Sequence, residues 1–126
     1  MQTAIVMIIL TVLPGGDISS SFVNIDTRDE CQTRLQRIEP ILRNGKIEVK
    51  EAGCFRGEAQ FDDFDHAPPG DAPRFSYLVS LQADRADVRE MESPEACRDA
   101  LPRQSPQHGL RHYCTLSTQG PKTTGN

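Results

Sequence analysis

The hydrophobic pattern of the chain begins with a continuous apolar run over residues 4–13, rich in β-branched and aliphatic side chains. It stops at a turn signal, Pro14-Gly15-Gly16-Asp17. Such a run predicts a strand inside a sheet, covered on both faces. Its length also fits the apolar part of a secretory signal peptide, but no Lys or Arg precedes it and no good small-x-small cleavage site follows. We therefore favour the strand, and the alternative is that residues 1–16 are a signal peptide.

The two halves of the chain show the same signals when they are aligned on Cys31 and Cys97. Each cysteine lies in the first turn of a predicted helix. Thr27 is the expected N-cap of the first helix and Ser93, followed by a proline, that of the second. A leucine follows each cysteine by four residues, which puts both side chains on one inward helical face. Pro40 should kink the first helix or end it early.

Two strands are predicted before each helix and one after it. They cover residues 4–13, 19–25 and 46–50, the last running on toward Cys54, and then 75–81, 86–91 and 110–116. The pattern predicts an α+β fold of two tandem β-β-α-β repeats, with antiparallel sheet(s) and one helix per repeat packed on a face. It leaves open whether the two repeats share one sheet.

The same pattern predicts how the chain is divided. The first unit is expected at 1–57 and the second at 74–117. An acidic, Pro-rich linker at 58–73 separates them, and residues 118–126 are expected to form a disordered tail.

The four cysteines are expected to pair within each unit, because a helix start and a final strand recur in both. The candidates are Cys31 with Cys54 and Cys97 with Cys114. Whether the pairs are bridged or are reduced neighbours stays open, since it depends on the compartment. Zinc is not expected, because no Cys-x-x-Cys or Cys/His cluster is present, and no other metal or cofactor is indicated.

Composition and charge narrow the function classes. The chain has 126 residues, of which 37% are hydrophobic and 25% charged, as in globular proteins. Eighteen acidic against fourteen basic residues give a formal charge of −4, which argues against direct binding to nucleic acid. A protein partner with a basic surface fits this charge better.

No standard catalytic signature is present. The histidines are His66, His108 and His112, all in predicted loops or near strand ends, and we interpret them as exposed polar residues. His112 is two residues from Cys114, but a thiolate pair is disfavoured because the cysteine has a better partner. We expect no enzyme activity.

One segment differs from its surroundings, and its residues are the candidate binding site: Phe61, Asp62, Asp63, Phe64 and Asp65. A calcium loop is disfavoured by the spacing, and a solvated linker is the commonest fate of such a stretch. Two aromatic residues among aspartates nevertheless suit a docking surface. The rings would anchor the partner, and the charges would select a basic one.

The first 56 or so residues resemble short, uncharacterised bacterial and prophage reading frames. The shared features are the apolar start, the Gly15-Gly16 turn, and the helix capped at Thr27 with an early Cys31. The resemblance implies no activity and favours a phage or mobile-element origin.

Together these features predict a small, non-enzymatic, cytoplasmic protein-binding module. An example would be a phage-type inhibitor of a basic, nucleic-acid-binding host or defence protein. The alternative is an exported, disulfide-stapled protein of the periplasm or cell surface. An enzyme of unfamiliar type is the third hypothesis.

Overall fold

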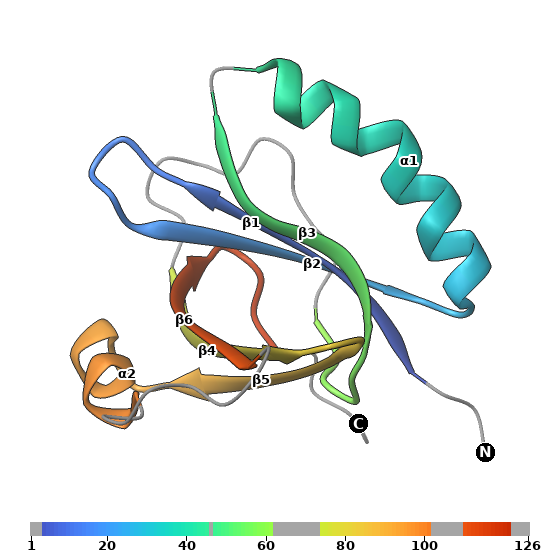
Figure 1. The fold of residues 1–126 in the computed structure, drawn as a ribbon. Helices are drawn as coiled ribbons and strands as arrows, with labels where there is room; N and C mark the ends of the chain where they lie inside the picture. The colour runs from blue at the N-terminus through green and yellow to red at the C-terminus, as the bar shows by residue number, and fades with distance from the viewer. Residues whose placement is uncertain (1–3, 46, 62–73, 102–109, 122–126) are drawn as a thin grey trace.

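The fold is α+β, with one mixed six-stranded sheet and two helices (Figure 1). The computed structural model describes residues 4–45, 47–61, 74–101 and 110–121. In chain order the elements are β1 (Ile5–Val12), β2 (Ile18–Ile25), α1 (Arg28–Asn44), β3 (Glu48–Arg56), β4 (Phe75–Gln82), β5 (Arg85–Met91), α2 (Pro94–Ala100) and β6 (Leu110–Ser117). The predicted α+β class is thus confirmed.

The strands form a closed barrel in the order β1-β2-β6-β4-β5-β3. Within the first half, β1 pairs antiparallel with β2 and β3, and within the second half β4 pairs antiparallel with β5 and β6. The halves meet through two short parallel contacts, one between β2 and β6 and one, Arg56 with Arg85, between β3 and β5. The prediction of purely antiparallel pairing is therefore wrong at these two junctions. Both halves belong to one closed sheet.

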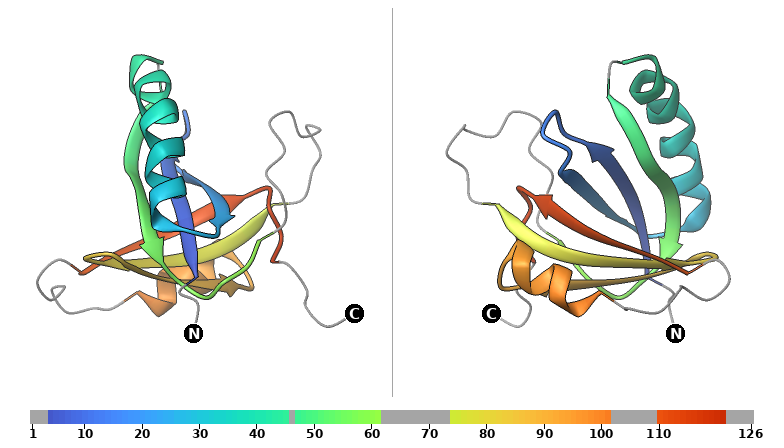
Figure 2. Two further views of the ribbon diagram at one scale, coloured as in Figure 1. Left: turned by 90° about the vertical axis from the view of Figure 1, so that its right-hand side faces the viewer. Right: turned by 60° about the vertical axis from the view of Figure 1, so that its left-hand side comes forward.

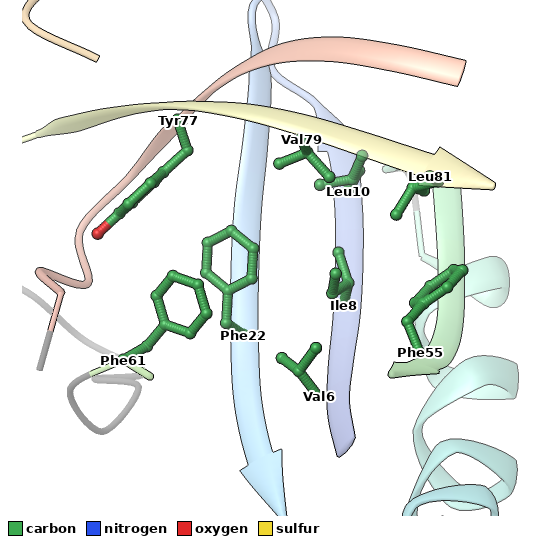
Figure 3. Close-up of a cluster of buried hydrophobic side chains, with 9 residues drawn as sticks. All are labelled: Val6, Ile8, Leu10, Phe22, Phe55, Phe61, Tyr77, Val79 and Leu81. Carbon is green, nitrogen blue, oxygen red and sulfur yellow. The ribbon is translucent and has the colours of Figure 1, made fainter. Parts of the chain in front are cut away.

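The apolar run at the start of the chain is a buried strand, as predicted. β1 lies between β2 and β3, and its side chains alternate between two hydrophobic clusters. Val6, Ile8 and Leu10 point into the barrel (Figure 3). Met7 and Ile9 belong to the outer cluster, which α1 covers. A strand with a core on both faces needs apolar residues at every position, which explains the uninterrupted run.

The inside of the barrel is packed with side chains from both halves (Figure 3). The buried members are Val6, Ile8, Leu10, Phe22, Phe55, Phe61, Tyr77, Val79 and Leu81. Since three of the nine come from β4 and five from β1, β2 and β3, neither half encloses this core alone.

The helix α1 lies against the outer face of the β1, β2 and β3 side, and α2 lies on the β4, β5 and β6 side (Figures 1 and 2). The Thr27 hydroxyl accepts a hydrogen bond from the Glu30 backbone N–H at 3.1 Å, and Ser93 caps α2 in the same way. Of the two outcomes expected at Pro40, the early end is wrong, because α1 continues to Asn44. Pro40 is solvent-exposed, so water can bind the backbone carbonyl that loses its N–H partner.

Two of the predicted boundaries need correction. The tail was expected to be disordered from residue 118, but Gln119 is only 2% exposed and Gly120 is buried. Pro121 forms a β-bridge with Phe61, which belongs to the predicted linker. The chain therefore stays packed from 57 to 61 and from 118 to 121, because these short segments cover core that the six strands leave open. The rest of the expected linker and tail lies outside the described residues.

Candidate functional site

Phe61 is part of the hydrophobic core and cannot be an exposed anchor. Only 6% of the residue is exposed. Its ring stacks on Phe22 with centroids 4.0 Å apart and planes 8° from parallel, and it meets Tyr77 edge-on at 5.6 Å. The prediction of Phe61 as a surface contact is wrong, because its ring, although two aspartates follow it in the sequence, packs into an apolar site inside the barrel. The other candidate binding residues, Asp62, Asp63, Phe64 and Asp65, lie outside the described residues.

Side-chain amides attach the segments around Phe61 to the edge of β2. Asn24 donates from Nδ2 to the Ala59 carbonyl at 2.9 Å and accepts from the Phe61 N–H at 2.9 Å. Gln119 pairs similarly with Phe22: its Nε2 donates to the backbone carbonyl at 2.7 Å, and its Oε1 accepts from the backbone N–H at 2.8 Å. The Gln119 amide thus replaces a neighbouring strand where β6 no longer pairs with β2, and the Asn24 side chain binds residues 59–61 to β2. Sequence reasoning missed Gln119, because nothing local distinguishes it from a polar tail residue.

A polar cluster connects β3 and β6, which are not neighbours in the sheet. The Arg111 guanidinium donates from Nε to Glu51 Oε2 at 2.6 Å, and the Tyr113 hydroxyl donates to the same oxygen at 2.6 Å. The Glu51 side chain is 17% exposed and that of Arg111 39% exposed. Tyr113 also packs against the inner core. The cluster therefore links two strands that no backbone hydrogen bonds join.

The environment of this cluster fixes its protonation. Desolvation, followed by the hydrogen bond to Glu51, raises the pKa of Tyr113 to about 12. The hydrogen bond from Arg111 to Glu51 raises the pKa of the guanidinium, against a smaller effect of desolvation. Near neutral pH the phenol is a neutral donor and the arginine is charged, so both donate to Glu51. This arrangement suits a structural link between β3 and β6 better than proton transfer.

His112 lies on β6 between Arg111 and Tyr113, and it contacts a serine of β4. A hydrogen bond of 2.7 Å joins His112 Nδ1 and Ser80 Oγ. The histidine is half-buried, so the expectation that it is exposed is wrong, and its Nε2 atom is buried without a hydrogen-bond partner among the described residues. A serine beside a histidine is the start of a nucleophile and base pair, but within the described chain no third group orients the ring. His66 and His108 lie outside the described residues.

Both predicted cysteine pairs are confirmed, each as a disulfide. Cys31 bonds to Cys54 with the Cα atoms 6.1 Å apart, and Cys97 bonds to Cys114 with 5.8 Å between them. In each half the bond joins the first turn of the helix to the last strand. Cys114 is therefore not available to His112.

An ion cluster lies at the second junction between the halves, where β3 meets β5. Asp84, in the turn between β4 and β5, contacts Arg28 at 3.3 Å and Arg56 at 3.1 Å. Desolvation raises the pKa of the Asp84 carboxyl, but the hydrogen bond and charge of Arg56, with the charge of Arg28, outweigh it and hold this pKa below its usual value. The groups are solvent-exposed, so we interpret the cluster as a surface contact with little effect on stability.

Two general searches complete the description of the site. In the described parts of the chain, no three His, Cys, Asp or Glu side chains are grouped so that they could hold a metal ion. Neither helix in these parts has the length and apolar character needed to cross a membrane.

Comparisons with protein-family models, with curated proteins and with solved structures found no match.

Proposed function

We propose that the chain is a small, non-enzymatic protein-binding module, held together by two disulfides and working in an oxidising compartment such as the periplasm or the cell exterior. The supporting observation is the cysteine arrangement, because all four cysteines are used in two separate bonds that each fasten a helix to a strand. Such structural disulfides persist in oxidising compartments and are rare in the cytosol.

The packing of the barrel favours recognition of a macromolecule over binding of a small ligand. Nine buried hydrophobic side chains occupy the inside of the barrel (Figure 3). Small-molecule sites are usually concave and largely preformed, whereas protein recognition uses the outer surface. We therefore place the function on the surface of the module.

The proposed partner is a protein with a basic surface. The formal charge of −4 supports this choice, and so does the series Asp62, Asp63 and Asp65 with Phe64 between them. Phe61 has a different role from the one first expected: it packs into the core directly before the acidic residues. It would fix the start of the segment on the barrel and leave Phe64 as the aromatic contact.

We also infer that the two halves are divergent copies of one β-β-α-β unit. In each half the first strand pairs with both other strands of that half, and one disulfide joins the helix start to the last strand. Duplication would explain why four cysteines occupy two matching sets of positions.

A second candidate is the cytoplasmic, phage-type inhibitor of a nucleic-acid-binding host or defence protein. The acidic charge and the resemblance of the first 56 residues to prophage reading frames support it. It requires the same surface but reduced cysteines, and the thiol state in cells therefore separates the two candidates.

Thiol labelling in the native host tests the proposed compartment. Cells are quenched in acid, and the denatured protein is reacted with a maleimide of high mass, with and without prior reduction. We expect no labelled cysteine before reduction and four afterwards, with the protein outside the cytosolic fraction. Four labelled cysteines before reduction, in cytosolic protein, would refute the oxidising compartment and favour the second candidate.

Charge variants test the proposed contact once a partner has been recovered by cross-linking in cells. Replacing Asp62, Asp63 and Asp65 with Asn should slow association by roughly tenfold at low salt and reduce its salt dependence. The matched control removes three exposed carboxylates near α2, in the variant Glu92→Gln, Glu95→Gln, Asp99→Asn. Equal effects of the two triple variants would show that only the net charge matters for association. The proposal that this segment contacts the partner would then be wrong.

A further inference from the structure

One edge of β5 has no strand beside it in the described chain. β5 pairs with β4 from Arg85 to Met91, but on its other side only Arg85 is paired, with Arg56 of β3. Gly57 crosses directly after that point: a Cβ atom added to it would lie 2.8 Å from the Ala86 carbonyl oxygen. From residue 87 to 91 no described strand pairs with this edge.

The hairpin geometry shows which backbone groups point away from β4. The turn Ala83-Asp84 connects β4 and β5 and closes on the pair Gln82 and Arg85. In a two-residue hairpin this closing pair is hydrogen-bonded, and hydrogen-bonded pairs recur at every second residue. The N–H and C=O groups of Ala86, Val88 and Glu90 therefore point outward.

The side chains around the centre of this edge carry opposite charges. Asp87 and Arg89 are exposed and flank Val88. Among the described residues neither forms a salt bridge. An exposed strand edge normally carries charge or is covered, which prevents uncontrolled pairing. One acidic and one basic residue on this edge can instead match a second copy of the same edge.

We propose that two copies of this chain pair through β5, antiparallel, about a two-fold axis at Val88. In this register each Val88 exchanges both backbone hydrogen bonds with the partner's Val88. Asp87 then faces the partner's Arg89, and Arg89 faces the partner's Asp87. Both are non-hydrogen-bonded pairs, in which opposite side chains are closest, and opposite charges there are favourable.

The neighbouring registers fit less well. An axis at Ala86 would centre the pairing on Gly57, which already lies against that carbonyl. With the axis at Val88, Gly57 is met only at the end of the pairing, where Ala86 faces the partner's Glu90, so the paired segment is limited to residues 87–89. An axis at Glu90 places Arg89 opposite Met91 and leaves both charges without a complement. Charge complementarity therefore selects the axis at Val88 and a second copy of this chain as the occupant. The dimer would extend β6-β4-β5 into one continuous six-stranded sheet.

Because the paired segment is short, we expect a reversible dimer with a Kd of roughly 10 µM to 1 mM. Sedimentation velocity of the full, oxidised chain over this concentration range should show a shift from monomer to dimer. A chain that stays monomeric throughout would refute the proposal.

Charge reversal tests the register. Asp87→Arg puts two arginines opposite each other twice, and Arg89→Asp does the same with two aspartates. Each single variant should therefore raise the Kd at least about tenfold. An equimolar mixture of the two variants should form a heterodimer, since every charge then meets its opposite, and the double variant should recover dimerisation to within about threefold of the parent.

The mixing experiment also controls for folding, because damaged chains would not recover on mixing. Arg37→Asp, on the exposed surface of α1, is the matched control and should dimerise like the parent. If both single variants dimerise like the parent, or if the folded single variants fail to pair when mixed, the proposed interface is wrong.

Discussion

At the scale of single residues, Phe61 contributes to stability and not to an exposed surface. Replacing it with Ala removes a ring stacked on Phe22 and should lower the free energy of unfolding by about 3 kcal/mol or more, as for other buried aromatic residues. Urea unfolding measures the change. Ile41→Ala is the control, because Ile41 is 73% exposed and its loss should cost less than about 0.5 kcal/mol. A Phe61→Ala variant as stable as the parent would contradict its place in the core.

Tyr113 gives the protein a pH dependence in the alkaline range. Desolvation, and then the hydrogen bond to Glu51, raise its pKa from 10.0 to about 12. Because the folded state binds this proton more tightly than the unfolded state, the associated stability is present below pH 10 and is lost as the pH rises toward 12. Absorbance titration of phenolate should show a step near the upper value that is missing in Tyr113→Phe.

Glu51→Gln should move that step to lower pH without removing it, because desolvation remains. If the titration of the Glu51→Gln variant matches that of the parent, the carboxylate does not act on the phenol.

At the scale of elements, the part of β2 that β6 does not pair with depends on Gln119 as a substitute strand. Gln119→Ala leaves the backbone N–H and C=O of Phe22 buried without their partners and should cost about 2 kcal/mol. The opening free energy that protects the Phe22 amide should fall by the same amount, so hydrogen exchange at this amide should be faster. Thr118→Ala is the control, since this residue lies one position away and its side chain takes no part in the hydrogen bonds between Gln119 and Phe22. Unchanged protection at Phe22 would mean that the tail does not hold this edge.

Each disulfide fastens a helix to the sheet, and each should stabilise its own half. The bonds close loops with sequence separations of 23 and 17 residues, for which chain entropy predicts about 3 kcal/mol each. Replacing Cys31 and Cys54 together with Ala, or Cys97 and Cys114 together, should lower the urea midpoint by similar amounts. Reductant should then have a smaller effect on either variant than on the parent. An unchanged midpoint for both variants would contradict a stabilising role.

At the scale of the whole molecule, the two halves should not fold separately. The inner core takes its side chains from both halves, and Phe61 and Gln119 close the barrel from outside the six strands. A fragment of residues 1–57 loses β4, β5, β6 and both closing segments. We expect narrow amide dispersion in its NMR spectrum, and recovery of native dispersion only when residues 58–126 are added. A fragment 1–57 with native-like dispersion would show that the first half is an independent domain.

The local signals in the sequence determined the elements of this protein. Hydrophobic runs, turn residues and the caps Thr27 and Ser93 depend on neighbours within a few residues, and these predicted the six strands, the two helices and, through the repeated order, both cysteine pairs. The exception was the early helix end expected as one outcome at Pro40: α1 continues past this solvent-exposed residue to Asn44.

Only the tertiary structure decided how the strands close into a barrel and which side chains meet or are buried. The closed barrel depends on two short contacts between strands far apart in sequence, and no periodicity encodes such pairing. Glu51 meets Arg111 across 60 residues, and Phe61 stacks on Phe22 of β2, because burial depends on which surfaces finally face each other. Composition assigned Phe61 to a linker and Gln119 to a tail; the free energy of covering an open core placed both inside.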